Sequence, residues 1–201
     1  MNEAQKNSVR NLQYLYTTVI GLGLSLAIYN LIDTTRVYIP LKLEFLPFFF
    51  TFLITLIPFY HGALRHLDIT YIEQGGKQVR NGALMIDFLA LFIEGCLLLI
   101  LALIVVKPMF FVWGLVVLLA FDTLWAFTAY LGFSQDLKLK AEPRWAIINF
   151  ITAIGLSILL IFVPPCLDIL DSKLVVLIPL VALIRTVIDY IWCWNYYYPS
   201  S

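Results

Sequence analysis

Charge is scarce in this sequence of 201 residues. Asp, Glu, Lys and Arg make up 13% of it, whereas hydrophobic residues make up 62%. The formal net charge is zero, so the overall charge indicates no particular partner in solution. So apolar a composition excludes an ordinary soluble protein with a single apolar core.

Cysteine is also rare, and the chain lacks the usual catalytic motifs. The three cysteines are scattered without CxxC spacing, which indicates neither a disulfide framework nor a metal site: Cys96, Cys166 and Cys193. There is no GxSxG elbow and no complete phosphate-binding loop, because Gly75-Gly76-Lys77 stands alone. His61 and His66 are five residues apart, which does not fit HExxH. We therefore expect no cofactor and no metal, and no motif assigns the chain to a known family.

Six long apolar runs dominate what is present. A hydrocarbon layer of roughly 30 Å requires about 20 apolar residues of helix. The runs are continuously apolar and lack the alternation of a barrel strand. They predict an all-α polytopic membrane protein, a bundle of six transmembrane helices forming one domain over residues 1–201. The expected spans are 14–32, 46–65, 83–106, 109–130, 145–163 and 174–194.

Basic residues in the connections predict the orientation, since cytoplasmic loops carry an excess of Lys and Arg. If both termini are cytoplasmic, the outer side holds only Arg36, Lys42, Lys107 and Lys173. The inner side then holds Lys6, Arg10, Arg65, Lys77, Arg80, Lys138, Lys140 and Arg144. We therefore expect cytoplasmic termini in a plasma membrane or bacterial inner membrane.

Several of the apolar runs contain a charged residue. Glu94 lies near the middle of the third run and Arg185 near the middle of the sixth. Each such group costs roughly 2.5–3.5 kcal/mol on insertion scales, which marks it as a functional candidate. Five helices together direct polar groups into the cytoplasmic half of the membrane. The predicted ion-pathway or gating residues are His61, Asp87, Glu94, Asp122, Asn149, Arg185 and Asp189.

Two explanations of these residues compete. One is a buried salt-bridge network, although polar contacts between membrane helices average only ~0.6 kcal/mol. The other is a water-accessible vestibule open to the cytoplasm. In that interpretation Glu94 and Asp87 set a preference for cations, Arg185 pairs with Glu94 or Asp122 in a closed state, and His61 makes opening sensitive to pH.

The vestibule leads to the expected function. We expect an integral membrane ion channel or small-ion transporter, embedded in the lipid bilayer and favouring a cation. A chain with so few helices is expected to line a path as a homo-oligomer. Pro58 and Pro179 are candidate hinges.

Two other functions remain open. The first is a non-catalytic membrane anchor or sensor that binds a partner or an anionic cytoplasmic regulator through its basic inner loops. Its basic surface would comprise Arg65, Lys77, Arg80, Lys138, Lys140 and Arg144. The second is an intramembrane enzyme using His61, His66, Asp68 and Asp87. The aromatic segment 192–198 is expected to anchor the chain at the headgroup level.

Overall fold

The computed structural model describes residues 3–33, 35, 40–73, 82–132, 141–162 and 173–198. In these segments the regular structure is helical, apart from one isolated bridge between Ile32 and Leu41. The six long helices are α1 (Glu3–Leu31), α2 (Leu46–Leu67), α3 (Ala83–Leu103), α4 (Pro108–Gly132), α5 (Glu142–Phe162) and α6 (Leu174–Trp192). All six are long and apolar enough to cross a membrane, which confirms the predicted all-α membrane protein.

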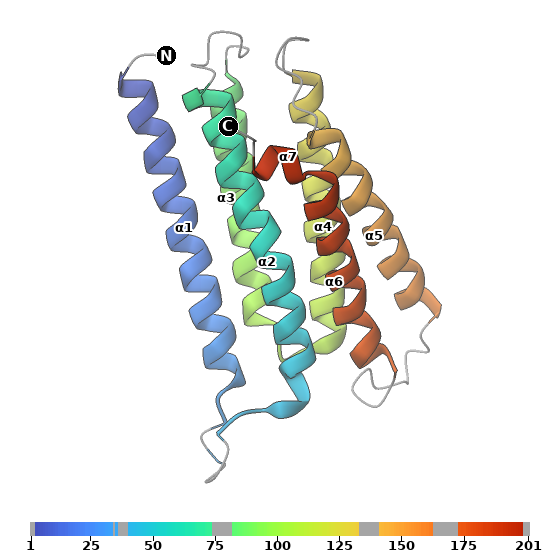
Figure 1. The fold of residues 1–201 in the computed structure, drawn as a ribbon. Helices are drawn as coiled ribbons and strands as arrows, with labels where there is room; N and C mark the ends of the chain where they lie inside the picture. The colour runs from blue at the N-terminus through green and yellow to red at the C-terminus, as the bar shows by residue number, and fades with distance from the viewer. Residues whose placement is uncertain are drawn as a thin grey trace.

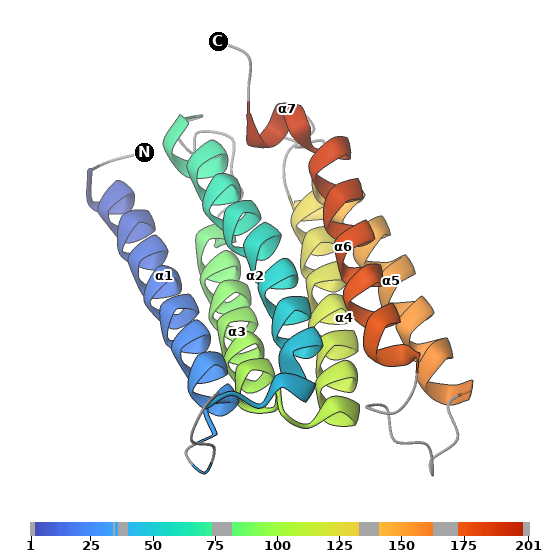
Figure 2. The ribbon, with the colours of Figure 1, turned by 60° about the horizontal axis from the view of Figure 1, so that its bottom comes forward.

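Three short elements flank these helices. A 3₁₀ turn, Leu43–Phe45, leads into α2, and a π-helical segment, Asp68–Glu73, continues α2 beyond Leu67. After a break at Cys193, the four-residue helix α7 (Trp194–Tyr197) turns across the end of the bundle (Figures 1 and 2). We call the end that carries α7 the α7 end, and the other the opposite end. Helices α1, α3 and α5 begin at the α7 end, whereas α2, α4 and α6 run toward it.

The first helix begins well before its predicted start at residue 14. Its buried residues recur every three or four positions along the whole helix: Val9, Leu12, Tyr16, Ile20, Gly23, Ala27 and Leu31. This spacing places them on one helical face. The stripe therefore begins inside the polar stretch, where a search for continuous apolar runs does not detect it.

The helices lie in two layers. Helices α1, α3, α4 and α5 stand in a row, and α2 and α6 cover one side of it (Figures 1 and 2). The most extensive helix contacts join α4 to α5, α1 to α3 and α2 to α6. Helix α2 therefore lies between α1 and α6, where side chains from several helices can meet.

A proline inside α2 strengthens the contact between α2 and α6. Pro58 has no backbone N–H, so it leaves the Ile54 carbonyl without its usual helical partner. The hydroxyl of Thr186 on α6 donates a hydrogen bond to this carbonyl at 3.1 Å. A neighbouring helix thus satisfies the group that proline frees, as expected inside a membrane.

The core changes character along the bundle. In the half toward the opposite end it is apolar, and the rings of Phe48 and Phe111 meet edge to face with centroids 5.8 Å apart. Leu98 and Leu101 of α3 are buried in the same half. Toward the α7 end, the buried positions include most of the charged side chains that the structure encloses. The polar half contains the candidate site.

Candidate functional site

Six of the seven predicted pathway residues are buried inside the bundle. Asp87 and Glu94 come from α3, Asp122 from α4, and Asn149 from α5, while α6 contributes two more. None of the six is more than 7% exposed: Asp87, Glu94, Asp122, Asn149, Arg185 and Asp189. The structure thus brings together side chains that are up to 102 positions apart, from Asp87 to Asp189.

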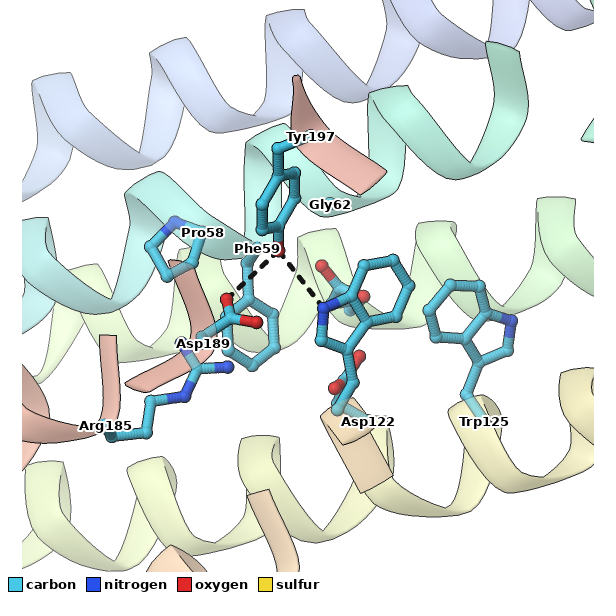
Figure 3. A pocket seen from close by; sticks show the side chains of 10 residues that line it. Pro58, Phe59, Gly62, Asp122, Trp125, Arg185, Asp189 and Tyr197 are labelled. Atoms are coloured by element: carbon cyan, nitrogen blue, oxygen red, sulfur yellow. Dashed lines mark hydrogen bonds between the residues drawn. The ribbon is translucent and has the colours of Figure 1, made fainter. Parts of the chain in front are cut away.

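Four of these residues surround a small cavity between α2, α3, α4 and α6 (Figure 3). Glu94, Asp122, Arg185 and Asp189 supply its charged lining. The volume is about 20 Å³, enough for one water-sized species. Its remaining lining residues are Pro58, Phe59, Gly62, Trp125, Trp145 and Tyr197. The sequence predicted a water-accessible vestibule open to the cytoplasm, and at this place the structure has a cavity of about 20 Å³ with aromatic side chains filling the space around it.

Arg185 is joined to Asp122 through an amide. Its Nε and Nη2 donate to the Asn149 side-chain carbonyl at 2.9 and 2.7 Å, and the Asn149 amide nitrogen donates to Asp122. The guanidinium also lies 5.0 Å from the centroid of the Phe59 ring, a cation–π distance. None of the ion pairs in the described residues involves Arg185. The direct pair of Arg185 with Glu94 or Asp122 is therefore absent here, since Asn149 stands between the guanidinium and the carboxylate.

The other two carboxyl groups of the cavity are held by tyrosines. The hydroxyl of Tyr16 on α1 donates to Glu94. The hydroxyl of Tyr197 on α7 donates to Asp189 at 3.0 Å and accepts a hydrogen bond from Trp145 Nε1 at 3.1 Å (Figure 3). Burial and the nearby Asp189 raise the pKa of Tyr197, so its hydroxyl remains a donor.

Charge is unbalanced around the cavity. Three carboxyl groups, on Glu94, Asp122 and Asp189, share it with one guanidinium. Asp189 Oδ1 and Arg185 Nη1 are buried and have no hydrogen-bond partner among the residues that the structure describes. Uncompensated charge is costly at such depth. The cluster is therefore suited to accept a further positive charge, and a water-sized species would find both an acceptor and a donor there.

A second polar cluster lies closer to the α7 end. His66 is fully buried between two carboxyl groups: its Nε2 lies 3.1 Å from Asp87 and its Nδ1 lies 3.3 Å from Glu142. Asp87 also accepts hydrogen bonds from Tyr71 at 2.6 Å and from Trp125 Nε1 at 3.2 Å. Trp125 lines the cavity as well, so one indole separates the two clusters.

The π-helical segment explains how His66 and Tyr71 reach the same oxygen. Both contact Asp87 Oδ2 although they are five residues apart. In an α-helix, five residues correspond to about 500°, which would turn the two side chains well away from each other. The i to i+5 pattern of a π-helix brings them onto one face.

Other predicted residues have separate partners. His61 lies outside the cavity, with Nδ1 3.2 Å from the Tyr190 hydroxyl, and Asp68 accepts a hydrogen bond from Gln13 at 2.8 Å. Of the four residues in the enzyme hypothesis, the structure brings together only His66 and Asp87. No group of three His, Cys, Asp or Glu in the described segments is placed to hold a metal ion.

The basic inner surface is described only in part. Arg65 pairs with Glu73 and its Nε donates to the Tyr196 carbonyl at 3.0 Å, while Arg144 donates to the Trp192 carbonyl. Both arginines are therefore engaged at the corner between α6 and α7. The other predicted members of this surface lie outside the described residues: Lys77, Arg80, Lys138 and Lys140.

Sequence reasoning missed several residues of the site, among them Tyr16, Tyr71, Tyr197 and Glu142. Tyr16 lies in an apolar run and Tyr71 in the polar connection after the second run, and neither pattern identifies a hydroxyl that donates to a buried carboxylate. Tyr197 belongs to the segment expected at the headgroups, yet it is only 4% exposed. Glu142 was assigned to a loop, although an acid followed by proline is typical of a helix start and could have identified it.

Comparison with known proteins adds no assignment, because no family model, curated protein or solved structure matches this chain. Six membrane-spanning helices with a polar interior indicate an integral membrane protein.

Proposed function

We propose that this protein moves a small cation across the membrane, as a channel or transporter, and that the cavity lined by Glu94, Asp122, Arg185 and Asp189 is its binding site. The observation that carries the proposal is the excess of carboxyl groups over the guanidinium in a buried cavity. A bound cation or proton would relieve this excess.

The size of the site limits what it takes. A cavity of about 20 Å³ has room for a proton carried by water or for a dehydrated monovalent ion, and not for an organic solute. A proton fits best, because carboxyl groups next to hydroxyl and indole donors exchange protons without rearrangement of the helices. The proposed species is therefore a proton, with a small monovalent ion as the other candidate.

The proposed path runs through a single bundle. All four charged lining residues belong to one chain, so a homo-oligomer is not needed to line the site. We place the α7 end in the cytoplasm, since more of the described basic residues lie there (Lys6, Arg10, Arg65 and Arg144) than at the opposite end (Lys42, Lys107 and Lys173). Toward the opposite end, the buried apolar residues form the closed barrier of this conformation.

Flux from proteoliposomes tests the proposal. Purified protein is reconstituted with an internal pH dye, and proton, Na⁺ and K⁺ gradients are imposed in turn. The decisive variant is Glu94→Gln, because the amide retains an oxygen for the Tyr16 hydroxyl while removing the charge. The matched control is Glu3→Gln, at an exposed carboxylate outside the cavity.

We expect Glu94→Gln to reduce flux by at least about tenfold, while Glu3→Gln remains within about twofold of the unmodified protein. Absence of flux from the folded, unmodified protein under every gradient would overturn the proposal. Equal flux from both variants would show that the cation does not depend on Glu94 for its passage.

A further inference from the structure

The short helix α7 lies across the α7 end of the bundle and carries one residue into it (Figures 2 and 3). Tyr197 is buried, whereas Trp194 and Tyr198, on either side of it in sequence, are 56% and 48% exposed. An anchor at the headgroups would expose all three aromatic rings. Tyr197 is therefore placed differently from its neighbours.

Tyr197 fills the side of the cavity nearest the α7 end. Its ring stacks on His61 of α2 with centroids 4.6 Å apart, and its hydroxyl bridges Asp189 of α6 and Trp145 of α5. It thus connects three helices at once. A Cβ built on Gly62 would lie 3.5 Å from both the Tyr197 hydroxyl and Trp145, so the glycine faces this contact directly.

Two arginines hold the corner in place. Arg65 of α2 donates to the carbonyl of Tyr196, and Arg144 of α5 donates to the carbonyl of Trp192. Carbonyls at a helix C-terminus lack partners within the helix, and cationic donors stabilise them. The Arg65 bond attaches α7 to α2, whereas the Arg144 bond attaches the last turn of α6, directly before the break at Cys193, to α5.

The segment itself has little intrinsic stability. Helix α7 contains four residues, and the chain breaks its helical geometry at Cys193, where φ is −106° and ψ is 15°. A helix of this length forms through its contacts and not through its own propensity. Motion of α7 about Cys193 would withdraw Tyr197 without disturbing the six long helices.

From this geometry we infer that α7 is a gate, with Tyr197 as the plug that separates the charged cavity from the aqueous phase at the α7 end. The inference rests on the proposed function, because it assigns the control of access to the same site. When α7 swings outward, Tyr197 leaves Asp189, and the cavity opens to water and cations. When it returns, the bond from Arg65 to the Tyr196 carbonyl holds it in place.

A cysteine in place of Gly62 reports whether the cavity is open, independently of any flux. The distances of 3.5 Å around its Cβ are ordinary van der Waals contacts, and thermal unfolding of the Gly62→Cys protein checks that the added sulfur leaves the fold intact. The native cysteines are replaced by serine (Cys96, Cys166 and Cys193). The purified protein in nanodiscs is then treated with a small charged methanethiosulfonate, and the rate of modification is measured.

We expect the Gly62→Cys protein to react slowly and the added change Tyr197→Ala to accelerate the reaction by at least about tenfold, corresponding to two lost hydrogen bonds and a lost ring. Tyr198→Ala removes the same type of side chain one position later and should change the rate by less than about twofold. Tyr197→Phe retains the ring and loses both hydrogen bonds, so its modification rate should lie between the rates of the other two variants. Because this change is conservative, it also shows that a fast rate does not result from misfolding of the alanine variant.

The modification rates test the gate, and the flux measurements test cation transport, so the two proposals can fail independently. Rapid modification before any change at Tyr197, or equal rates for Tyr197→Ala and Tyr198→Ala, would overturn the gate. Modification that requires loss of Tyr197, in a protein without flux, would retain the gate and overturn cation transport. Flux that depends on Glu94 but is unchanged by Tyr197→Ala would retain transport and overturn the gate.

Discussion

The two halves of the bundle solve the problem of packing inside a membrane in different ways. Toward the opposite end, helices meet through apolar side chains such as Phe48, Phe111 and Leu101. Toward the α7 end the same helices meet through His66, Asp122 and other buried polar groups, joined by hydrogen bonds between helices. One set of helices therefore carries a hydrophobic seal at one end and a charged interior at the other.

The two halves differ in what their contacts contribute. Polar contacts between membrane helices contribute only ~0.6 kcal/mol each on average, so the hydrogen bonds of the polar half add little to the stability of the bundle. The concentration of three carboxyl groups around one guanidinium is thus better explained by a function than by stability. The following variants test where this contrast holds.

The largest effect is expected from Arg185→Leu. It removes the only guanidinium of the cavity and leaves Asn149 and three carboxyl groups without it. Breaking a buried charge network from one side costs about 3–5 kcal/mol. The measurement is unfolding in detergent micelles followed by circular dichroism.

The protein with both Arg185→Leu and Asp122→Leu should recover part of the lost stability, because one of the unpaired carboxyl groups is removed as well. A loss equal to or larger than that of Arg185→Leu alone would contradict this account.

A polar group in the apolar half should weaken the seal. Leu98 lies one turn beyond Glu94 on α3 and is 1% exposed. Leu98→Ala and Leu98→Ser both leave a cavity and should cost about 2–4 kcal/mol of stability. Only the serine adds a hydroxyl, so we expect it alone to raise passive proton leak in proteoliposomes. Equal leak from the two variants would show that the barrier is not the apolar half.

A smaller effect is expected where α1 meets α3. A Cβ on Gly95 would lie 2.9 Å from Val19 Cγ1, closer than side chains tolerate, whereas a Cβ on Gly155 meets nothing within 4 Å. Gly95→Ala should destabilise the protein by about 1–3 kcal/mol through overpacking. Gly155→Ala should be neutral or stabilise it by up to about 1 kcal/mol. Thermal unfolding of both variants in the same detergent checks the pair, and similar midpoints would contradict the close packing.

The smallest effect is expected at the surface of the α7 end. Lys6 and Glu3 form an exposed ion pair within one turn of α1. Such pairs contribute about 0–0.5 kcal/mol, so Lys6→Ala should leave the unfolding midpoint nearly unchanged. A large shift would mean that the pair has a partner beyond α1.

The sequence predicted the helices and much of the site for identifiable reasons. A charge within an apolar run is conspicuous, and this signal correctly gathers Asp87, Glu94 and Asp189 in the interior. Their partners give no such signal. Tyr16 lies in an apolar helix, and Tyr197 reaches the cavity only because the chain turns at Cys193. Turns and hydrogen-bond partners depend on tertiary packing, which periodicity and hydropathy do not encode.

His61 illustrates a different limit of sequence reasoning. It looks like the strongest titratable candidate in α2, because it lies deeper in the run than His66. The structure buries His66 completely between Asp87 and Glu142, and leaves His61 among the tyrosines of α6 and α7. Depth along a helix is readable from the sequence, whereas the direction that a side chain faces depends on which helices are its neighbours.

The π-helical segment after α2 also has a consequence for chain length. A π turn can be regarded as an α-helix that has accommodated one extra residue. Deleting Ile69 would let the helix close into regular α geometry, with little change in the span itself. It would also leave Tyr71 four positions after His66, which corresponds to about 400° of α-helix and keeps both side chains on the face toward Asp87. The π turn thus absorbs one residue without changing which side chains meet Asp87, so a deletion of one residue at this point should be tolerated by the polar half.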